Sequence, residues 1–368
     1  RKPTRTQLLK YASIYRRPVI SFYLKSPPKK GERGHDFRTA AVAHATDREN
    51  GLLDALLRDI TARQEMIVDL LESNQEAAER PFVGSAKIED GSASLVSSIA
   101  KELQFDNTSK DARKGGVDGI FRDLRARAES IGVFVVIAGD LGSHHTALGT
   151  DLFRGFAIAD KIAPFVVIND QDARSAWSFT LIHELAHVWL GQTGVSGETG
   201  ANDPKTFEER IERYCDDVAS QFLLPPEAVR EKPTRTMDTP DAAASVIATF
   251  ANQWCVSEPM VAYRFYRMSW ISNNIYRELN AEYVRRWRAS RQGEKEEAKE
   301  GETGPNYYVV RQHRLGSALI DLVRRNLRGD NITHTKAAKV LGIKPGIVEP
   351  LLRHFESARG IAAPGAGG

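Results

Sequence analysis

Residues 179–190 read FTLIHELAHVWL, and this stretch decides the fold. Its apolar run predicts a helix over about 172–190, capped by Asp170 or Asp172 and ended at Gly191. Two histidines and a glutamate lie inside the run. Charged groups in such a place are costly unless they are paired or bind a metal, so this helix is the best candidate for a functional site.

The charged residues of this helix are spaced to hold a metal ion. Residues i and i+4 share one face of a helix, so His183 and His187 can aim both imidazoles at one ion. Glu212, on the next predicted helix, is available as a third ligand. Asp216, one turn further along, suits a hydrogen bond to a ligand histidine. Catalytic zinc keeps three protein ligands and one open position, which would place Glu184 as a general base.

Two other interpretations of the motif are weaker. The bare pattern H-E-x-x-H arises by chance in about one chain per hundred of this length, and its charges could be a polar patch satisfied by neighbours. A structural zinc site usually has four ligands, mostly thiolates. Only Cys215 lies near the motif, and we expect it to pack as a small apolar group.

The hydrophobic pattern elsewhere changes period along the chain. Short β-branched runs predict strands at 133–138 and 164–168, with a further strand at 153–159 between them. Apolar residues at helical spacing predict a long helix within 39–79 and another over 207–224. Further helices are expected at 6–15, 92–104, 117–130, 240–252 and 257–290, and a further strand at 19–24.

Composition suggests five consecutive regions. Residues 1–38 are basic and Pro-rich and read as an N-terminal connector, and 39–290 hold the main domain. Residues 291–306 are charged with almost no apolar content, which is typical of a flexible linker. Apolar periodicity returns over 307–358, a helical module. The Gly/Ala/Pro tail 359–368 is expected to be disordered.

The C-terminal module has a helix-turn-helix rhythm. Residues 331–355 read NITHTKAAKVLGIKPGIVEPLLRHF, where Thr335 can cap one helix, Gly342 supply a turn, and Pro345 open a second helix. The region is basic, which suits phosphate contacts. Pro350 would kink a recognition helix, however. A small helical subdomain that packs on the rest of the chain or binds a protein is the favoured interpretation, and DNA binding is the alternative.

Composition excludes few classes of protein. The chain has 368 residues, 41% of them hydrophobic, and a formal net charge of +3 that favours no particular partner. This length allows one large domain or two ordinary ones. Two cysteines make no disulfide scaffold, so a reducing, cytoplasmic environment is expected. No apolar run reaches the roughly 18 residues that a membrane span needs.

Four segments of the chain resemble the ImmA/IrrE family of metallopeptidases. They are 153–156 (FRGF), 163–169 (APFVVIN), 179–187 (FTLIHELAH) and 212–225 (ERYCDDVASQFLLP). The resemblance implies an α+β fold, mostly helical, in which a small twisted sheet packs on the HExxH active-site helix. The C-terminal helix-turn-helix-like module would be an addition to that fold.

The resemblance also implies roles for individual residues. His183, His187 and Glu212 would bind Zn2+, and Glu184 would be the general base. The family often has Asn where this chain has Asp216. An Asp at this position resembles the E-x-x-x-D helix of thermolysin-like, or gluzincin-like, peptidases.

The family's activity supplies the expected function. Characterised members cleave a helix-turn-helix repressor, so the resemblance implies an intracellular zinc endopeptidase that switches on stress-response or mobile-element genes. Residues 1–38 would then be the end of a helix-turn-helix region. The alternative is a DNA- or protein-binding regulator, of toxin–antitoxin type, with a peptidase-like fold. The intact Glu184 argues against that alternative.

Two features of substrate binding are left open by the sequence. In such peptidases an edge strand usually receives the substrate backbone; 153–159 and 164–169 are the candidates, and the alternative is that both are interior strands. Metallopeptidases also add a Tyr, His or Arg donor for the oxyanion. The candidates for that donor are His144, His145, Tyr214, Tyr263 and Tyr266.

Overall fold

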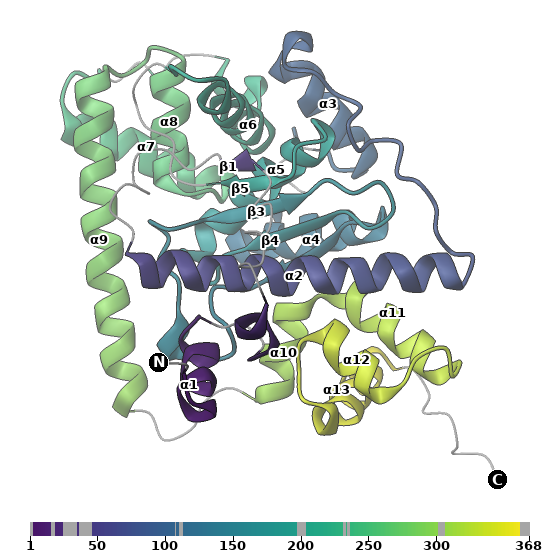
Figure 1. Cartoon of the computed structure of the whole chain (residues 1–368). Coiled ribbons are helices and arrows are strands. Elements are labelled where there is room, and N and C mark those ends of the chain that lie inside the picture. Colours follow the sequence, from purple (N-terminus) through teal and green to yellow (C-terminus); the bar gives the residue numbers. More distant parts are fainter. Residues whose placement is uncertain are drawn as a thin grey trace.

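A computed structural model gives the fold of the chain, in which many helices surround one small sheet (Figure 1). It describes residues 3–15, 19–24, 35–36, 46–106, 108–109, 113–196, 204–230, 233, 236–300 and 306–360. The α+β, mostly helical fold class expected from the resemblance is confirmed. Within these residues, no helix combines the length and the apolar character needed to cross a membrane.

The sheet is mixed, and its strands follow the order β1-β5-β3-β4-β2. These strands are β1 (His35–Asp36), β2 (Phe134–Ile137), β3 (Gly155–Ile158), β4 (Phe165–Ile168) and β5 (Gly194–Ser196). β2 runs parallel to β4, whereas β3 is antiparallel to both β4 and β5. β3 and β4 are therefore interior strands. The expectation that one of them is the edge that receives substrate is wrong, because both sides of each strand already pair with neighbours.

Alternate residues of the strands face two separate cores. In β2, Val135 and Ile137 belong to a core with the helices that carry the HExxH motif. Phe134 and Val136 point into the second core, on the opposite face of the sheet. This alternation follows from the period of two in a strand. It explains why β2 and β4 are apolar throughout, with all four residues of each buried.

The first core is built by the helices that follow the sheet in the sequence. α5 (Arg174–Trp189) packs against α6 (Phe207–Leu223), α4 (Gly116–Ser130) and the strands β3 and β4. α3 (Ser92–Glu102) and α8 (Glu258–Arg267) pack on α6. Helix α5 is thus covered on several sides, as its apolar run requires.

The second core joins the C-terminal helices to the rest of the chain. α2 (Asp47–Ser73) packs on α12 (His334–Leu341), while α10 (Tyr307–Leu315) packs directly on β2. α11 (Ser317–Arg328) and α13 (Pro345–Arg359) complete this group of helices, which Figure 1 shows next to α2. Buried residues of all five helices share one core with the strands. The segment predicted to be a C-terminal helical module therefore packs on the sheet and α2, which agrees with the favoured interpretation of a subdomain that packs on the rest of the chain.

Several local predictions differ from the structure. Residues 19–24 form the 3-10 helix η1 (Val19–Tyr23) instead of a strand. The helix expected over 257–290 is two helices, α8 and α9 (Asn273–Glu300). α9 continues to Glu300, where a linker was expected. Residues 301–305 of that expected linker, and 361–368 of the tail, lie outside the described residues.

The other helices of the described chain are η3 (Ile88–Asp90), η5 (His144–Thr146), η6 (Pro226–Val229), α1 (Arg5–Tyr15) and α7 (Pro240–Trp254).

The predicted helix caps are also corrected. α5 begins after Ala173, which makes no side-chain cap, so neither Asp170 nor Asp172 fills that role. α12 is capped by the Thr333 hydroxyl, which accepts from the Lys336 amide, and Thr335 is not the cap. Cap positions depend on where the chain first becomes helical, which a run of polar residues does not fix to one residue.

Candidate metal centre

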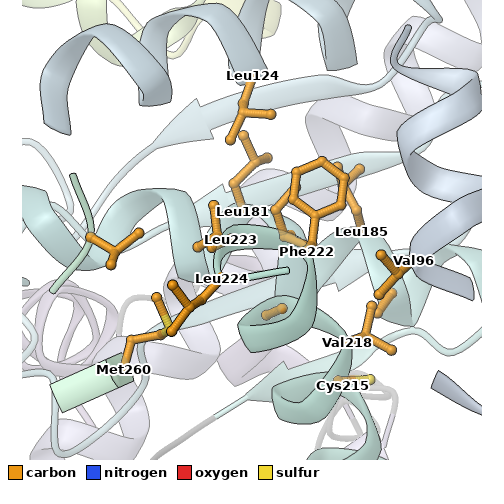
Figure 2. Close-up of a cluster of buried hydrophobic side chains, with 14 of the residues drawn as sticks. Val96, Leu124, Leu181, Leu185, Cys215, Val218, Phe222, Leu223, Leu224 and Met260 are labelled. Carbon is orange, nitrogen blue, oxygen red and sulfur yellow. The ribbon is translucent and has the colours of Figure 1, made fainter. Parts of the chain in front are cut away.

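Helices α5 and α6 are held in register by apolar side chains beneath the polar ones. Figure 2 shows Leu181 and Leu185 of α5 close to Val218 and Phe222 of α6 within one cluster. A capping box at Thr206 begins α6. Because both helices bury apolar residues at helical spacing, the interface also fixes which polar residues of each helix face one another.

Three of the predicted ligand residues meet at this interface. The Nε2 atom of His187 lies 2.9 Å from Oε1 of Glu212, and Nε2 of His183 lies 3.4 Å from Oε2 of the same carboxylate. The two Nε2 atoms are 3.1 Å apart. All three residues are buried, and one ligand atom from each lies within 4.8 Å of the others. The structure therefore brings together two nitrogens and a carboxylate in the set that catalytic zinc sites use.

Asp216 lies behind the first histidine. Its Oδ1 atom is 2.9 Å from Nδ1 of His183. If Nδ1 donates a proton to this carboxylate, Nε2 keeps its lone pair and points toward Glu212. That is the tautomer a metal ligand needs, and a carboxylate in this place also increases the basicity of the imidazole.

The electrostatics of the centre favour a positive charge. Burial opposes protonation of His183, but the Glu212 and Asp216 carboxylates raise its pKa well above the ordinary value. Burial alone would raise the pKa of Glu212, yet the two histidines outweigh it and the pKa is lowered. Both oxygens of Glu212 are buried and, among the described residues, have no donor in good hydrogen-bond geometry. A cation between these groups would satisfy them, so the donor set fits a metal such as zinc.

Glu184 lies beside the centre and is fully buried. Burial raises the pKa of Glu184 to about 8, although the nearby His183 opposes the rise. Neither of its oxygens has a well-aligned donor among the described residues. A carboxylate with a pKa near neutrality and unused acceptor capacity is suited to take and return a proton.

A cavity of about 630 Å³ opens onto the centre. His183, Glu184 and Asp216 are among its lining residues, together with side chains from α8 and α9. Pockets of this size hold small molecules or a few residues of an extended peptide. The reacting groups therefore face a space that a substrate can enter.

Of the five candidates for an oxyanion donor, Tyr263 lines this cavity. Its hydroxyl donates to Oδ1 of Asp217 at 2.9 Å. The Tyr214 hydroxyl instead donates to the Gly91 carbonyl, and Tyr266 stacks on Tyr276. His144 and His145 lie in η5; the side chain of His144 is outside the described part of the chain, and His145 is absent from the described lining.

Two residues of the centre were not identified from the motif. The hydroxyl of Ser196, at the end of β5, lies 3.3 Å from Nε2 of His187. Gly155 opens β3, and a Cβ atom there would lie only 2.6 Å from Oε1 of Glu184. Gly155 lies within segment 153–156, which resembles the ImmA/IrrE family, and this resemblance was the sequence signal that could have pointed to Gly155. Ser196 carries no such signal, because its position depends on strand pairing.

Comparison with known proteins gives one match. Residues 129–266 match the family model described as IrrE N-terminal-like domain, Peptidase_M78. No curated protein and no solved structure matches the chain. The matched segment supports peptidase activity, and it contains the two histidines, both glutamates and Asp216. The resemblance of this chain to the ImmA/IrrE family is therefore confirmed over residues 129–266.

Proposed function

We propose that the protein is a zinc-dependent endopeptidase. One observation carries the proposal. The buried side chains of His183, His187 and Glu212 lie close together, and Glu184 lies beside them at the wall of an open cavity. Bound zinc lowers the pKa of water and polarises a carbonyl group. His183, His187 and Glu212 would hold the ion, and Asp216 would orient His183.

Glu184 performs the proton transfers in this proposal. Its carboxylate accepts a proton from the attacking water and then gives that proton to the amine that leaves the broken peptide bond. Burial raises the pKa of this carboxyl group, which makes the carboxylate a stronger base for the first transfer. Glu184 lies at the wall of the cavity with its side chain fully buried.

The proposed substrate is a helix-turn-helix transcriptional repressor, cleaved in the cytoplasm to switch on a stress or mobile-element response. The support for this substrate is the likeness to the ImmA/IrrE family over residues 129–266. The cavity itself requires only a chain segment that fits between α5, α8 and α9, which supply much of its lining. DNA binding by residues 331–355 remains a separate prediction.

The test compares Glu184→Gln with the wild type, both loaded with zinc. The candidate substrate is a purified small helix-turn-helix repressor chosen from the genes that neighbour this one, and products are identified by mass spectrometry. We expect the wild type to cleave it and Glu184→Gln to lose at least about a thousandfold in rate, since both proton transfers are removed. Metal analysis should give equal zinc content for the two proteins.

The exposed Glu227 provides a matched control, because it lies outside the cavity lining. Glu227→Gln should cleave at the wild-type rate. Full activity of Glu184→Gln would overturn the catalytic assignment. Cleavage of a different protein with the repressor left intact would overturn the substrate alone.

A further inference from the structure

A second cavity, of about 670 Å³, lies on the other face of the sheet. It is enclosed by α2, the end of β2 with the loop that follows it, α10 and α12. Its described lining shares no residue with the cavity of the metal centre. Space of this size is typical of sites for small organic ligands.

The lining combines an apolar floor with many positive charges. Leu56, Met66, Val136 and Ile343 contribute apolar surface. The charged lining residues are five cations and two carboxylates: Arg58, Arg63, Arg311, Arg314 and Lys339, with Asp59 and Asp140. Positive charge is therefore in excess around a partly enclosed space, where an anion is attracted strongly because water screens less.

Arg63 shows that this excess is built into the fold. Its guanidinium pairs with Asp59, yet its Nε atom is buried with no hydrogen-bond acceptor among the described residues. Burial lowers the pKa of Arg63, and the positive charge of Arg311 acts in the same direction, while Asp59 opposes both. Asp59 can balance only one of the two positive charges, and a second cation beside a buried one is costly unless a further anion joins them.

Gly342 makes room for this arginine. It has a φ of +61° at the turn between α12 and α13, and a Cβ atom there would lie 1.8 Å from the Arg63 Nη2 atom. The glycine thus serves both the left-handed turn and the approach of the guanidinium. The turn between α12 and α13 therefore accommodates the Arg63 guanidinium.

We propose that the second cavity binds a phosphorylated organic molecule. The phosphate would contact Arg63, Arg311 and Lys339, since guanidinium and ammonium groups form short, charge-assisted hydrogen bonds to phosphate. The organic part would lie on the apolar floor. This inference is independent of the proposed peptidase activity, because the two cavities share no lining residue.

One cation also connects this cavity to the active-site helix. Arg314 pairs with Asp140 at 2.9 Å and with Asp170, four residues before the start of α5. Asp170 in turn accepts a hydrogen bond from the Gln171 side chain. A ligand in this cavity would therefore lie beside a cation that is paired with the segment leading into the HExxH helix.

The experiment is isothermal titration calorimetry on the full chain loaded with zinc. The probes are adenosine monophosphate, guanosine monophosphate, glucose 6-phosphate and inorganic phosphate, with adenosine as the uncharged reference. We expect at least one phosphorylated organic probe to bind with a stoichiometry of one, more tightly than inorganic phosphate or adenosine. Arg311→Gln and Lys339→Gln should each weaken that binding about tenfold, because each removes a charge-assisted contact.

Arg48→Gln is the matched control, since Arg48 is exposed on α2 and outside the described cavity lining. It should bind the probe as the wild type does. Lys339 is also exposed, so its variant should fold normally. The proposal is overturned if no phosphorylated organic probe binds at millimolar concentration. Unchanged binding in both Arg311→Gln and Lys339→Gln would overturn it as well, because any binding would then lie elsewhere.

Discussion

The Nδ1 atom of His183 lies 2.9 Å from the Oδ1 atom of Asp216, and both side chains are almost fully buried. This contact fixes which imidazole nitrogen of His183 can face Glu212. It crosses from α5 to α6, so the packing of the two helices and the orientation of a proposed ligand are established together.

Loss of the Asp216 carboxylate should weaken metal binding. We expect Asp216→Ala to lower zinc affinity by roughly 10- to 100-fold, because His183 is no longer oriented or made more basic. Asp216→Asn should lose less, since its side-chain oxygen can still accept from Nδ1. Competition with a chromophoric chelator measures both affinities. Equal affinities for wild type and Asp216→Ala would contradict the role assigned to this residue, and Glu227→Ala serves as the surface control.

Gly155 should resist substitution because it lies against the general base. In Gly155→Ala the new Cβ atom would lie 2.6 Å from Oε1 of Glu184 and 2.8 Å from Cγ2 of Thr180. We expect a destabilisation of about 1–3 kcal/mol from overpacking, together with loss of peptidase activity as Glu184 is displaced. Denaturant unfolding and kcat test the two effects. Gly51→Ala, on α2 with no atom within 4 Å of its Cβ position, should change neither adversely.

The clustering of His183, His187 and Glu212 in the candidate metal centre was predictable because its information is local. His183 and His187 are fixed relative to each other by one helical turn, and Glu212 and Asp216 by another. Only the pairing of the two helices had to be assumed. The contacts of Ser196 and Gly155 could not be predicted in the same way, since they depend on the register of β3 with β5.

Long-range packing accounts for the other differences. The hydrophobic stripes of 307–358 indicated buried helix faces, but a stripe does not say which surface covers it; here the cover is α2 and the sheet. The charged run after 290 was interpreted as a linker because it lacks apolar residues. A polar run can still continue a helix that is anchored earlier, as α9 is by Tyr276, Leu279 and Tyr283.

Tyr263 should contribute to catalysis rather than to metal binding. Burial raises the pKa of its hydroxyl well above the ordinary range, so the group stays protonated and can donate. We expect Tyr263→Phe to lower kcat about a hundredfold, as is usual when one oxyanion donor is removed, with zinc affinity unchanged. Tyr283→Phe is the matched control from the same cavity wall. An unaltered kcat in Tyr263→Phe would mean that Tyr263 has only a structural role, through its hydrogen bond with Asp217.

The junction between α4 and α11 should depend on Glu129. Its carboxylate pairs with Arg125 at 3.0 Å and accepts from the Ser317 and Ala318 amides, which begin α11. Glu129→Gln leaves the buried Arg125 without its counter-charge, so we expect a loss of about 2–4 kcal/mol in the free energy of unfolding. Thermal and denaturant unfolding measure this loss. The half-buried Asp123, also on α4 and paired with Arg127, offers the control Asp123→Asn, which should cost less than about 1 kcal/mol.

The stability of the metal-free protein should depend on pH through Glu184. Burial raises the pKa of this carboxyl group from 4.5 to about 8 in the folded chain. The folded state therefore binds the proton more tightly than the unfolded state between these two values. The stability that protonated Glu184 contributes is fully present below pH 4.5 and is lost as pH rises to 8. In that range the free energy of unfolding falls by up to about 1.4 kcal/mol per pH unit.

Glu184→Gln removes this titration and leaves the other groups of the centre in place. We expect the free energy of unfolding, measured with a chelator present between pH 5.5 and 7.5, to fall more steeply with pH in the wild type than in the variant. The comparison isolates Glu184 because His183, whose pKa is also raised, titrates in both proteins. Parallel pH profiles would mean that Glu184 is already ionised in the folded, metal-free chain, and that burial does not govern its charge.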